Sequence, residues 1–316
     1  MYIPEHQIRA VLTYQALIPA IRLVLIDYSA GRVDQPLRTV LRVKDKSGTP
    51  TGWFAVMPVI SGDYMAVKTV TFYPGNAALT GRGRAGRGRP GSERLHTHLA
   101  TIELLDRQTG EPLAVMDGRL ITEMRTAAVS AVAVEALAPS AKTLGILGGG
   151  VQARAHIAAL RQVQPAFCEA GGIRIWSRDP QKSAAIAAEY SATVAKIEEA
   201  AAADVVVTVT SATEPVLRGK WLGPHSLVVA VGAVGPQLRE LDDEAMQGYL
   251  VAESRQGAEN ESGDVILSGA KVQAEIGEIL AGSASPPPPG RCVFKSLGMA
   301  IEDLTGARLV WDALQS

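Results

Sequence analysis

A glycine-rich turn in the middle of the chain is its clearest chemical feature. Gly148, Gly150 and Ala153 have the G-x-G-x-x-A spacing, after the apolar run 144–147 and at the start of a helical pattern. In this setting the first glycine permits the turn, the second lets a pyrophosphate approach the backbone, and the small third residue lets the helix pack on the strand. The free N–H groups of the helix would bind phosphates. The same spacing occurs in ordinary turns, but the strand–turn–helix setting favours a dinucleotide fingerprint.

The residues after the next predicted strand, 173–176, indicate which dinucleotide binds. An NAD site usually has an acidic residue there for the ribose 2′-OH, whereas an NADP site needs a cation. This chain has Ser177 followed by Arg178, which would pair with a 2′-phosphate. The sequence therefore favours NADPH. NADH stays an alternative, because a small shift of the strand end would give the position to Asp179.

Two cations in the first third of the chain could act on a substrate. Arg38 precedes the apolar run 39–43 and could bind a carboxylate with its planar guanidinium. Lys68 lies within the apolar run 66–72, where burial would lower the pKa of its amine into a range that suits proton transfer. The alternative is that both lie on a solvated sheet face.

The elements that must position these residues divide the chain into two predicted domains. Residues 1–121 contain a short helix and then strands at 39–43, 53–59, 66–72 and 99–105, which indicate an antiparallel meander. A helix at 122–137 links this β-rich part to alternating strands and helices up to residue 299. Strands are expected at 144–147, 173–176, 204–210 and 227–231, and helices at 151–163 and 180–190. Such alternation predicts a parallel sheet, so the fold class is α/β, a Rossmann-type domain with a β-rich domain.

The composition excludes several classes of protein. The chain has 316 residues, 47% of them hydrophobic, and a net charge of −1, so it can form two cores and has no overall field for nucleic acid. Cys168 and Cys292 have neither disulfide nor metal-site spacing. The N-terminus does not resemble a signal peptide, and no apolar run is long enough to span a membrane, so we expect a cytoplasmic protein without a metal. The Arg/Gly-rich stretch 81–94 is interpreted as a solvated loop.

Several motifs together resemble the ornithine cyclodeaminase/μ-crystallin family. The resemblance runs from about residue 35 to the C-terminus and is strongest for the μ-crystallin, or ketimine reductase, branch. The motifs that carry it are Glu111-Pro112-Leu113-Ala114-Val115-Met116-Asp117-Gly118, Met124-Arg125-Thr126-Ala127-Ala128-Val129-Ser130-Ala131, the glycine turn, Glu261-Ser262-Gly263-Asp264 and Val293-Phe294-Lys295-Ser296-Leu297-Gly298-Met299.

The resemblance implies a homodimer whose β-rich substrate and dimerisation domain is completed by residues 300–316. It implies that Arg38 and Lys68 meet the substrate carboxylate and the reacting nitrogen, and that Arg125 lies close to substrate and cofactor. The cofactor positions that it implies are Thr97, His98, Arg125, Gly148, Gly150, Val151, Gln152, Ala153, Ser177, Arg178, Thr210, Val231, Gly232 and Ser296.

One departure from the family pattern narrows the chemistry. The cyclodeaminases and related alanine dehydrogenases carry an acid/base aspartate where this chain has Val234, and valine cannot transfer a proton. We therefore expect NAD(P)H-dependent reduction of a cyclic ketimine carboxylate, Δ1-pyrroline-2-carboxylate or Δ1-piperideine-2-carboxylate, to proline or pipecolate. One alternative is an ornithine cyclodeaminase or alanine dehydrogenase-like enzyme whose acid/base has moved to Glu240 or Asp264. The other is a non-enzymatic protein that binds NADPH and a small ligand.

Overall fold

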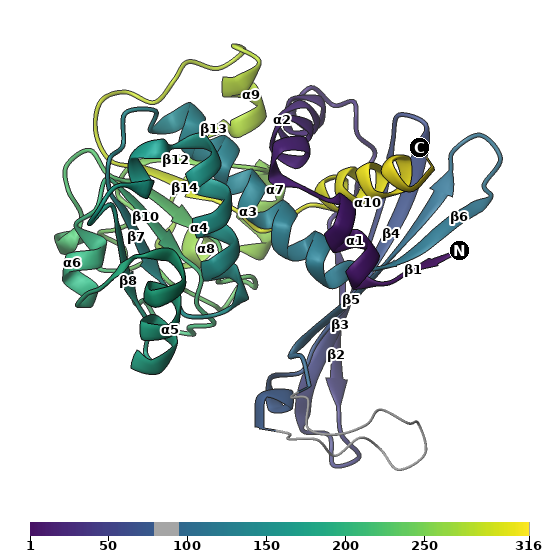
Figure 1. Cartoon of the computed structure of the whole chain (residues 1–316), viewed down its shortest axis with the longest axis horizontal. Coiled ribbons are helices and arrows are strands. Elements are labelled where there is room, and N and C mark those ends of the chain that lie inside the picture. The colour runs from purple at the N-terminus through teal and green to yellow at the C-terminus, as the bar shows by residue number, and fades with distance from the viewer. Residues whose placement is uncertain (79–94, 316) are drawn as a thin grey trace.

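Two β-sheets joined by helices form the molecule (Figure 1). The computed structural model describes residues 1–78 and 95–315. The Arg/Gly-rich stretch 81–94 lies outside the described residues, so its predicted loop is untested. Both chain ends lie beside the first sheet, although the second sheet is built from the residues between them (Figure 1).

The first sheet has six strands in the order β1-β6-β5-β4-β3-β2. Their bounds are β1 Tyr2–Ile3, β2 Thr39–Lys44, β3 Pro50–Ser61, β4 Tyr64–Phe72, β5 His98–Asp106 and β6 Pro112–Asp117. Strands β2 to β6 pair antiparallel in chain order, which confirms the predicted meander. Buried and less buried residues alternate along β4, as expected for a sheet with one packed face. The packed face contacts α10, Ala300–Gln315.

The second sheet is parallel and has eight strands in the order β13-β12-β14-β11-β10-β7-β8-β9. Their bounds are β7 Leu144–Leu147, β8 Ile173–Trp176, β9 Thr193–Val194, β10 Val205–Thr208, β11 Leu227–Ala230, β12 Tyr249–Ala252, β13 Ala274–Glu275 and β14 Cys292–Lys295. The strands β7, β10, β11 and β14 are buried along their whole length, so they read as continuous apolar runs. The predicted Rossmann-type α/β class is thereby confirmed.

The two helices predicted in the second half of the chain are confirmed as α4 and α5, four short helices there were not predicted, and the N-terminus differs from the prediction. The helices in the second half before α10 are α4 Val151–Val163, α5 Pro180–Tyr190, α6 Ile197–Ala201, α7 Arg255–Glu261, α8 Gly263–Ser268 and α9 Ile276–Leu280, with short 3-10 turns at Pro165–Cys168 and Gly219–Trp221. A further 3-10 turn, Pro74–Ala78, follows β4. We expected one short helix before the meander, but there are two, α1 Glu5–Val11 and α2 Tyr14–Ser29. Thr13 separates them, because its hydroxyl accepts a hydrogen bond from the Ala16 amide and caps α2.

Helix α3, Gly118–Leu137, connects the two sheets and begins four residues earlier than predicted (Figure 1). Asp117 ends β6 and caps α3 by accepting a hydrogen bond from the Arg119 amide, so no loop intervenes. Thirteen residues of α3 are buried, which explains its Ala-rich composition. The helix therefore fixes Arg125 between the sheets.

No single helix in the described residues is long and apolar enough to cross a membrane. Helices α1 and α2 pass that length and composition test only as a pair bent by 89°.

Candidate active site

The glycine turn after β7 leaves space in front of the first turn of α4. Gly148 has a φ of 142°, and a Cβ atom there would lie 2.6 Å from the carbonyl oxygen of Val209. Gly148 is therefore required for the turn itself. Gly150 differs, because a Cβ there would meet no atom of the described chain within 4 Å. That open space is where a phosphate could approach the backbone.

The N-terminus of α4 has unused hydrogen-bonding capacity. Its N-cap, Gly150, provides no side-chain cap, and Val151 is 62% exposed. The Oε1 atom of Gln152 is buried and finds no hydrogen-bond partner in the part of the chain that the structure describes. Ala153 is fully buried, as close packing of the helix on the strand requires. These features fit a bound dinucleotide, whose pyrophosphate would use the free amides.

A buried histidine holds the same helix in place. His156 donates its Nδ1–H to the carbonyl of Gln152 at 2.8 Å, and its Nε2 contacts the Ser130 hydroxyl at 2.9 Å. Burial lowers the pKa of His156 to about 4, so the ring is neutral at physiological pH. His156 thus connects the fingerprint helix to α3.

The end of β8 presents two exposed cations. Ser177 bonds to the Asp179 carbonyl at 2.6 Å and to the Ser183 hydroxyl at 2.7 Å, which fixes the turn. The carboxylate of Asp179 caps α5 by accepting a hydrogen bond from the Gln181 amide. This hydrogen bond uses one of the oxygens that an NADH ribose would need. Arg178 is exposed and forms no ion pair within residues 1–78 and 95–315. The second cation, the exposed Lys182, was missed by the sequence reasoning and follows Asp179 by three residues in the first turn of α5.

A buried glutamate fastens the loops that follow β10 and β11. Glu240 is fully buried and accepts hydrogen bonds from Thr210 N at 2.6 Å, Thr210 Oγ1 at 2.7 Å and Gly232 N at 2.7 Å. A Cβ at Gly232 would lie 2.1 Å from the Thr210 carbonyl oxygen, so the two loops touch. Both loops stand at the carboxyl edge of the sheet, together with Val231, which is 7% exposed. From the sequence, Glu240 was considered only as a relocated acid/base group, and this positioning role was missed.

Three cations converge on the segment that follows β14. Arg38 donates through Nη2 to the carbonyls of Leu297 at 3.0 Å and Gly298 at 2.7 Å. A Cβ at Gly298 would lie 2.3 Å from Nη1 of Arg125, so Arg125 contacts the same backbone from the other side. Arg125 Nε and Lys68 Nζ bind the two oxygens of Asp303, at 3.0 and 2.5 Å.

Lys68 occupies an apolar row of the first sheet. Its neighbours across the strands are Met57 and Ile102, both buried. The side chain of Lys68 is 3% exposed, which rules out the solvated-face alternative for this residue. Burial lowers the pKa of the Lys68 amine to about 8, although Asp303 opposes that shift. The lowered pKa predicted from the apolar run is therefore found in the structure.

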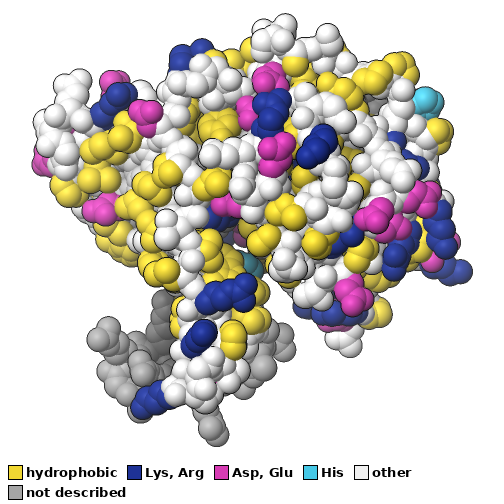
Figure 2. All heavy atoms as spheres, turned by 180° about the vertical axis from the view of Figure 1, so that it is seen from behind, with side chains coloured by type: hydrophobic (Ala, Val, Ile, Leu, Met, Phe, Trp, Pro, Cys, Tyr) yellow, Lys and Arg dark blue, Asp and Glu magenta, His cyan; other side chains and the backbone are white. Residues whose placement is uncertain are grey.

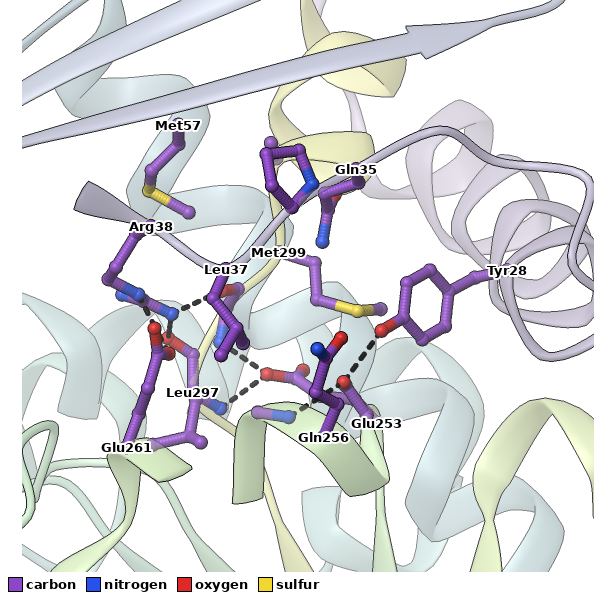
Figure 3. Close-up of a pocket in the computed structure, with 15 residues that line it drawn as sticks. Tyr28, Gln35, Leu37, Arg38, Met57, Glu253, Gln256, Glu261, Leu297 and Met299 are labelled. Carbon is purple, nitrogen blue, oxygen red and sulfur yellow. Dashed lines mark hydrogen bonds and ion pairs between the residues drawn. The ribbon is translucent and has the colours of Figure 1, made fainter. Parts of the chain in front are cut away.

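A cleft lies directly over this segment (Figure 3). It has an empty volume of about 410 Å³, including the part open to solvent. Arg38, Glu261, Leu297 and Met57 line one end, Tyr28 lines the other, and Met299 lies between them (Figure 3). Arg38 is bound to Glu261 at 2.9 Å through Nε. Its Nη1 has no partner in the described chain and is the donor left for a ligand.

The other predicted residues lie in different surroundings. Lys68 and Arg125 do not line the cleft but lie beneath it. Ser296 is fully buried, and its hydroxyl donates to Glu253 at 3.1 Å. His98 packs on Phe72 with ring centroids 4.4 Å apart, and burial lowers the pKa of its imidazole. Thr97 contacts His98 at 3.2 Å, so the described contacts of this pair stay within the first sheet.

The comparisons with known proteins agree with this arrangement. The model of the ornithine cyclodeaminase/mu-crystallin family matches residues 3–316. The chain belongs to this family. The ketimine reductase mu-crystallin of Mus musculus is 41% identical over 311 residues, which cover 95% of this chain and 92% of the relative.

Two solved structures of family enzymes share the fold. The Δ1-pyrroline-2-carboxylate reductase of Thermococcus litoralis, in complex with NADH and L-proline, has a TM-score of 0.86 and 31% identity, covering 100% of this chain and 97% of that one. An archaeal alanine dehydrogenase dimer with bound NAD has a TM-score of 0.88 and 25% identity, covering 100% and 96%.

Within the family, the structure argues against a relocated acid/base group. Asp264 is fully buried, accepts from the amides of Glu240 and Leu241, and binds Lys295 at 2.9 Å. The carboxylate of Glu240 accepts hydrogen bonds from the backbone amides of Thr210 and Gly232, and neither Glu240 nor Asp264 lines the cleft. Val234 packs against apolar residues of the second core. The cyclodeaminase and alanine dehydrogenase alternatives therefore lose the two relocated groups, Glu240 and Asp264, on which they depended.

Proposed function

We propose that this protein is an oxidoreductase that uses NADPH, or less effectively NADH, to reduce cyclic ketimine carboxylates to cyclic amino acids. The substrates would be Δ1-pyrroline-2-carboxylate and Δ1-piperideine-2-carboxylate, and the products proline and pipecolate. The observation that carries the proposal is the convergence of Arg38, Lys68 and Arg125 on residues 297–303, at the carboxyl edge of a dinucleotide-type sheet. The relatives named as ketimine and pyrroline-2-carboxylate reductases support it.

The cofactor would lie along the carboxyl edge of the parallel sheet. The turn Gly148–Gly150 and the amides that open α4 would hold the pyrophosphate, and Arg178 a 2′-phosphate. Val151, Gln152, Thr210, Val231 and Gly232 would form the walls. Thr97, His98 and Ser296 remain cofactor residues by family position only. When bound, the reduced nicotinamide supplies a hydride to the carbon of the C=N bond.

The protein's own residues would hold the substrate and its charge. Arg38 lines the cleft, and its Nη1 would bind the substrate carboxylate. Lys68 and Arg125 add positive charge beneath the cleft, and Lys68 would help to keep the substrate nitrogen protonated through a water molecule. Since a ketimine already contains the C=N bond, no amine needs to be deprotonated. Val234 is compatible with this reaction.

Consumption of NADPH with five- and six-membered ketimine carboxylates, repeated with NADH, tests the proposal. We expect turnover with both rings, faster with NADPH, and the cyclic amino acid as product. Ammonia release from L-ornithine or L-alanine with NAD+ would instead establish the deaminating alternative. Tight NADPH binding without oxidation by any ketimine would establish a binding protein.

We also propose that the protein is a homodimer formed through the outer face of the first sheet. Residues 1–121 and 300–316 would form the dimerisation domain and residues 122–299 the cofactor domain, and α10 packs on β3, β4 and β5 in support of this division. The outer face exposes Leu41 and Leu99 at 58% and 45%, and hydrophobic side chains gather over this lobe (Figure 2). The archaeal alanine dehydrogenase is a dimer.

Light scattering after size-exclusion chromatography checks the assembly. We expect the mass of a dimer for the natural chain and of a monomer for Val67→Glu. Val67 lies on the outer face, opposite Pro58, so a charge there would oppose a partner without entering the core. A monomeric natural chain would refute the dimer.

A further inference from the structure

Two buried carboxyl groups meet under the floor of the cleft. Glu253 follows β12, lines the cleft and is 1% exposed. Glu302, in the first turn of α10, is fully buried, and its carboxyl lies beside that of Glu253. Two ionised carboxylates cannot share such a site without strong repulsion, whereas one proton between them makes the contact a hydrogen bond.

The hydrogen bonds identify which of the two holds the proton at rest. Glu253 accepts hydrogen bonds from the Ser296 hydroxyl at 3.1 Å and from the amides of Leu297 and Gly298 (Figure 3). Glu302 Oε2 accepts only from Arg125 Nη1 at 2.6 Å, and its Oε1 has no donor among the residues that the structure describes. Burial and the charge of Glu253 raise the pKa of Glu302 well above its usual value. Glu302 is thus the acid of the pair.

The charges around the two carboxyl groups balance only when Glu302 is protonated and therefore neutral. The cations that face it are Arg125 from α3, Lys68 from β4 and Arg38 from the segment before β2. The other anions are Asp303 beside it on α10 and Glu261 from α7, and Tyr28 from α2 is a neutral neighbour bound to Ser254. Three cations and the three anions Glu253, Glu261 and Asp303 cancel, so an ionised Glu302 would leave an unbalanced buried charge.

We propose that Glu253 and Glu302 share one proton and deliver it to the ketimine nitrogen, with Glu253 as the residue that faces the substrate. This inference rests on the proposed reductase function. As the hydride adds to carbon, the π electron pair of C=N moves to nitrogen. The single shared proton passes from Glu302 to Glu253 and from Glu253 to the nitrogen, which forms its N–H bond with it. Solvent then returns one proton to the pair.

The position of Lys68 supports this assignment. Lys68 does not line the cleft, and its ammonium is held by Asp303 at 2.5 Å behind Met57, its neighbour across the strands. Glu253 reaches the cleft directly and stands in contact with a second acid. The pair can therefore give up a proton without breaking the Lys68–Asp303 ion pair.

The substitution Glu302→Gln separates proton delivery from structure. The amide of glutamine can donate to Glu253 and its oxygen can accept from Arg125, so both contacts of Glu302 persist while the transferable proton is lost. We expect kcat for the ketimine to fall by about 100-fold. The dissociation constant of NADPH and the melting temperature should stay near those of the natural chain. Unchanged kcat in Glu302→Gln would overturn the proposal.

Glu123→Gln is the matched control, and an infrared measurement on the natural chain is independent of any variant. Glu123 is another partly buried carboxyl on α3 with a raised pKa, but it faces Arg9 and Arg154 outside the cleft, so its substitution should leave turnover normal. With isotope-labelled glutamate, the natural chain should show the C=O band of a protonated carboxyl at neutral pH. The lack of that band would refute the shared proton, even if ketimine reduction is confirmed. Failure of the natural chain to oxidise NADPH would refute the function, whatever the spectrum shows.

Discussion

The cofactor crevice and the cation cluster are built in opposite ways. The crevice consists of backbone, glycine and small residues, and its key positions lie within six consecutive residues. The cluster consists of charged side chains from β4, α3, α10 and the segment before β2, which are far apart in the chain. The crevice would bind its ligand in open space, whereas the side chains of the cluster are already paired with one another in ion pairs.

This difference determines how each region responds to substitution. An added side chain at the open position of the crevice would block a ligand and leave the fold intact, because nothing in the described chain stands there. A removed side chain in the cluster leaves a partner charge buried without compensation, which costs about 3–5 kcal/mol. Binding and chemistry should therefore be separable by mutation.

The largest expected effect is on turnover, from the cluster. Arg38→Ala and Lys68→Ala should each lower kcat/KM for the ketimine by about 100- to 1,000-fold, because the carboxylate contact or the charge near nitrogen is lost. NADPH binding, measured by quenching of tryptophan fluorescence, should survive in both. Thermal unfolding serves as the control, since Lys68→Ala leaves Asp303 with one partner fewer. Near-normal rates in both variants would show that the active site lies elsewhere.

The matching effect on the crevice is a loss of cofactor binding. Gly150→Val should raise the dissociation constant of NADPH by about 10- to 100-fold, because the side chain occupies the space for the pyrophosphate. Its melting temperature without nucleotide should stay close to that of the natural chain. Gly148→Val should both bind NADPH more weakly and have a lower melting temperature, since a side chain there collides with the Val209 carbonyl. Equal NADPH affinity in Gly150→Val would remove the turn from the cofactor site.

A smaller effect concerns the choice between the two dinucleotides. Arg178→Ala should weaken NADPH binding by about 10-fold, the size of one exposed charge-assisted contact, and leave NADH binding unchanged. Lys182→Ala should have a weaker effect of the same kind. Parallel titrations with both nucleotides measure the ratio. If both affinities fall equally, Arg178 acts on the turn rather than on a 2′-phosphate.

The smallest effect is a shift in the pH profile. Since the pKa of Lys68 is lowered to about 8, Lys68 is protonated below that pH and neutral above it. Its contribution should be present at pH 7 and be lost as the pH rises through about 8, so kcat/KM should decline on the alkaline side. Lys68→Arg keeps the charge at high pH and should move this decline upward. An identical decline in both proteins would assign it to the substrate or to another group.

Local patterns predicted the second half of the fold well. The bounds of β7, α4, β8 and α5 agree with the predicted ranges, because buried parallel strands and capped amphipathic helices carry strong local signals. The strand expected at 204–210 ends at Thr208, whose hydroxyl donates a hydrogen bond to Glu240 where the following loop begins. The separate helices α1 and α2 were missed, because the signal that divides them is a single capping threonine.

The dinucleotide turn, the α/β class and the family could all be read from the amino-acid order, since each depends on residues close together in the chain or on motifs in a fixed order. Three features emerge only once the chain is folded: Lys68 and Arg125 share Asp303, Glu240 fastens two loops, and Glu253 meets Glu302. The physical reason is that a buried charge is stable only beside its partners. Those partners come from elements separated by as many as 235 residues, Lys68 to Asp303, whose meeting no local pattern records.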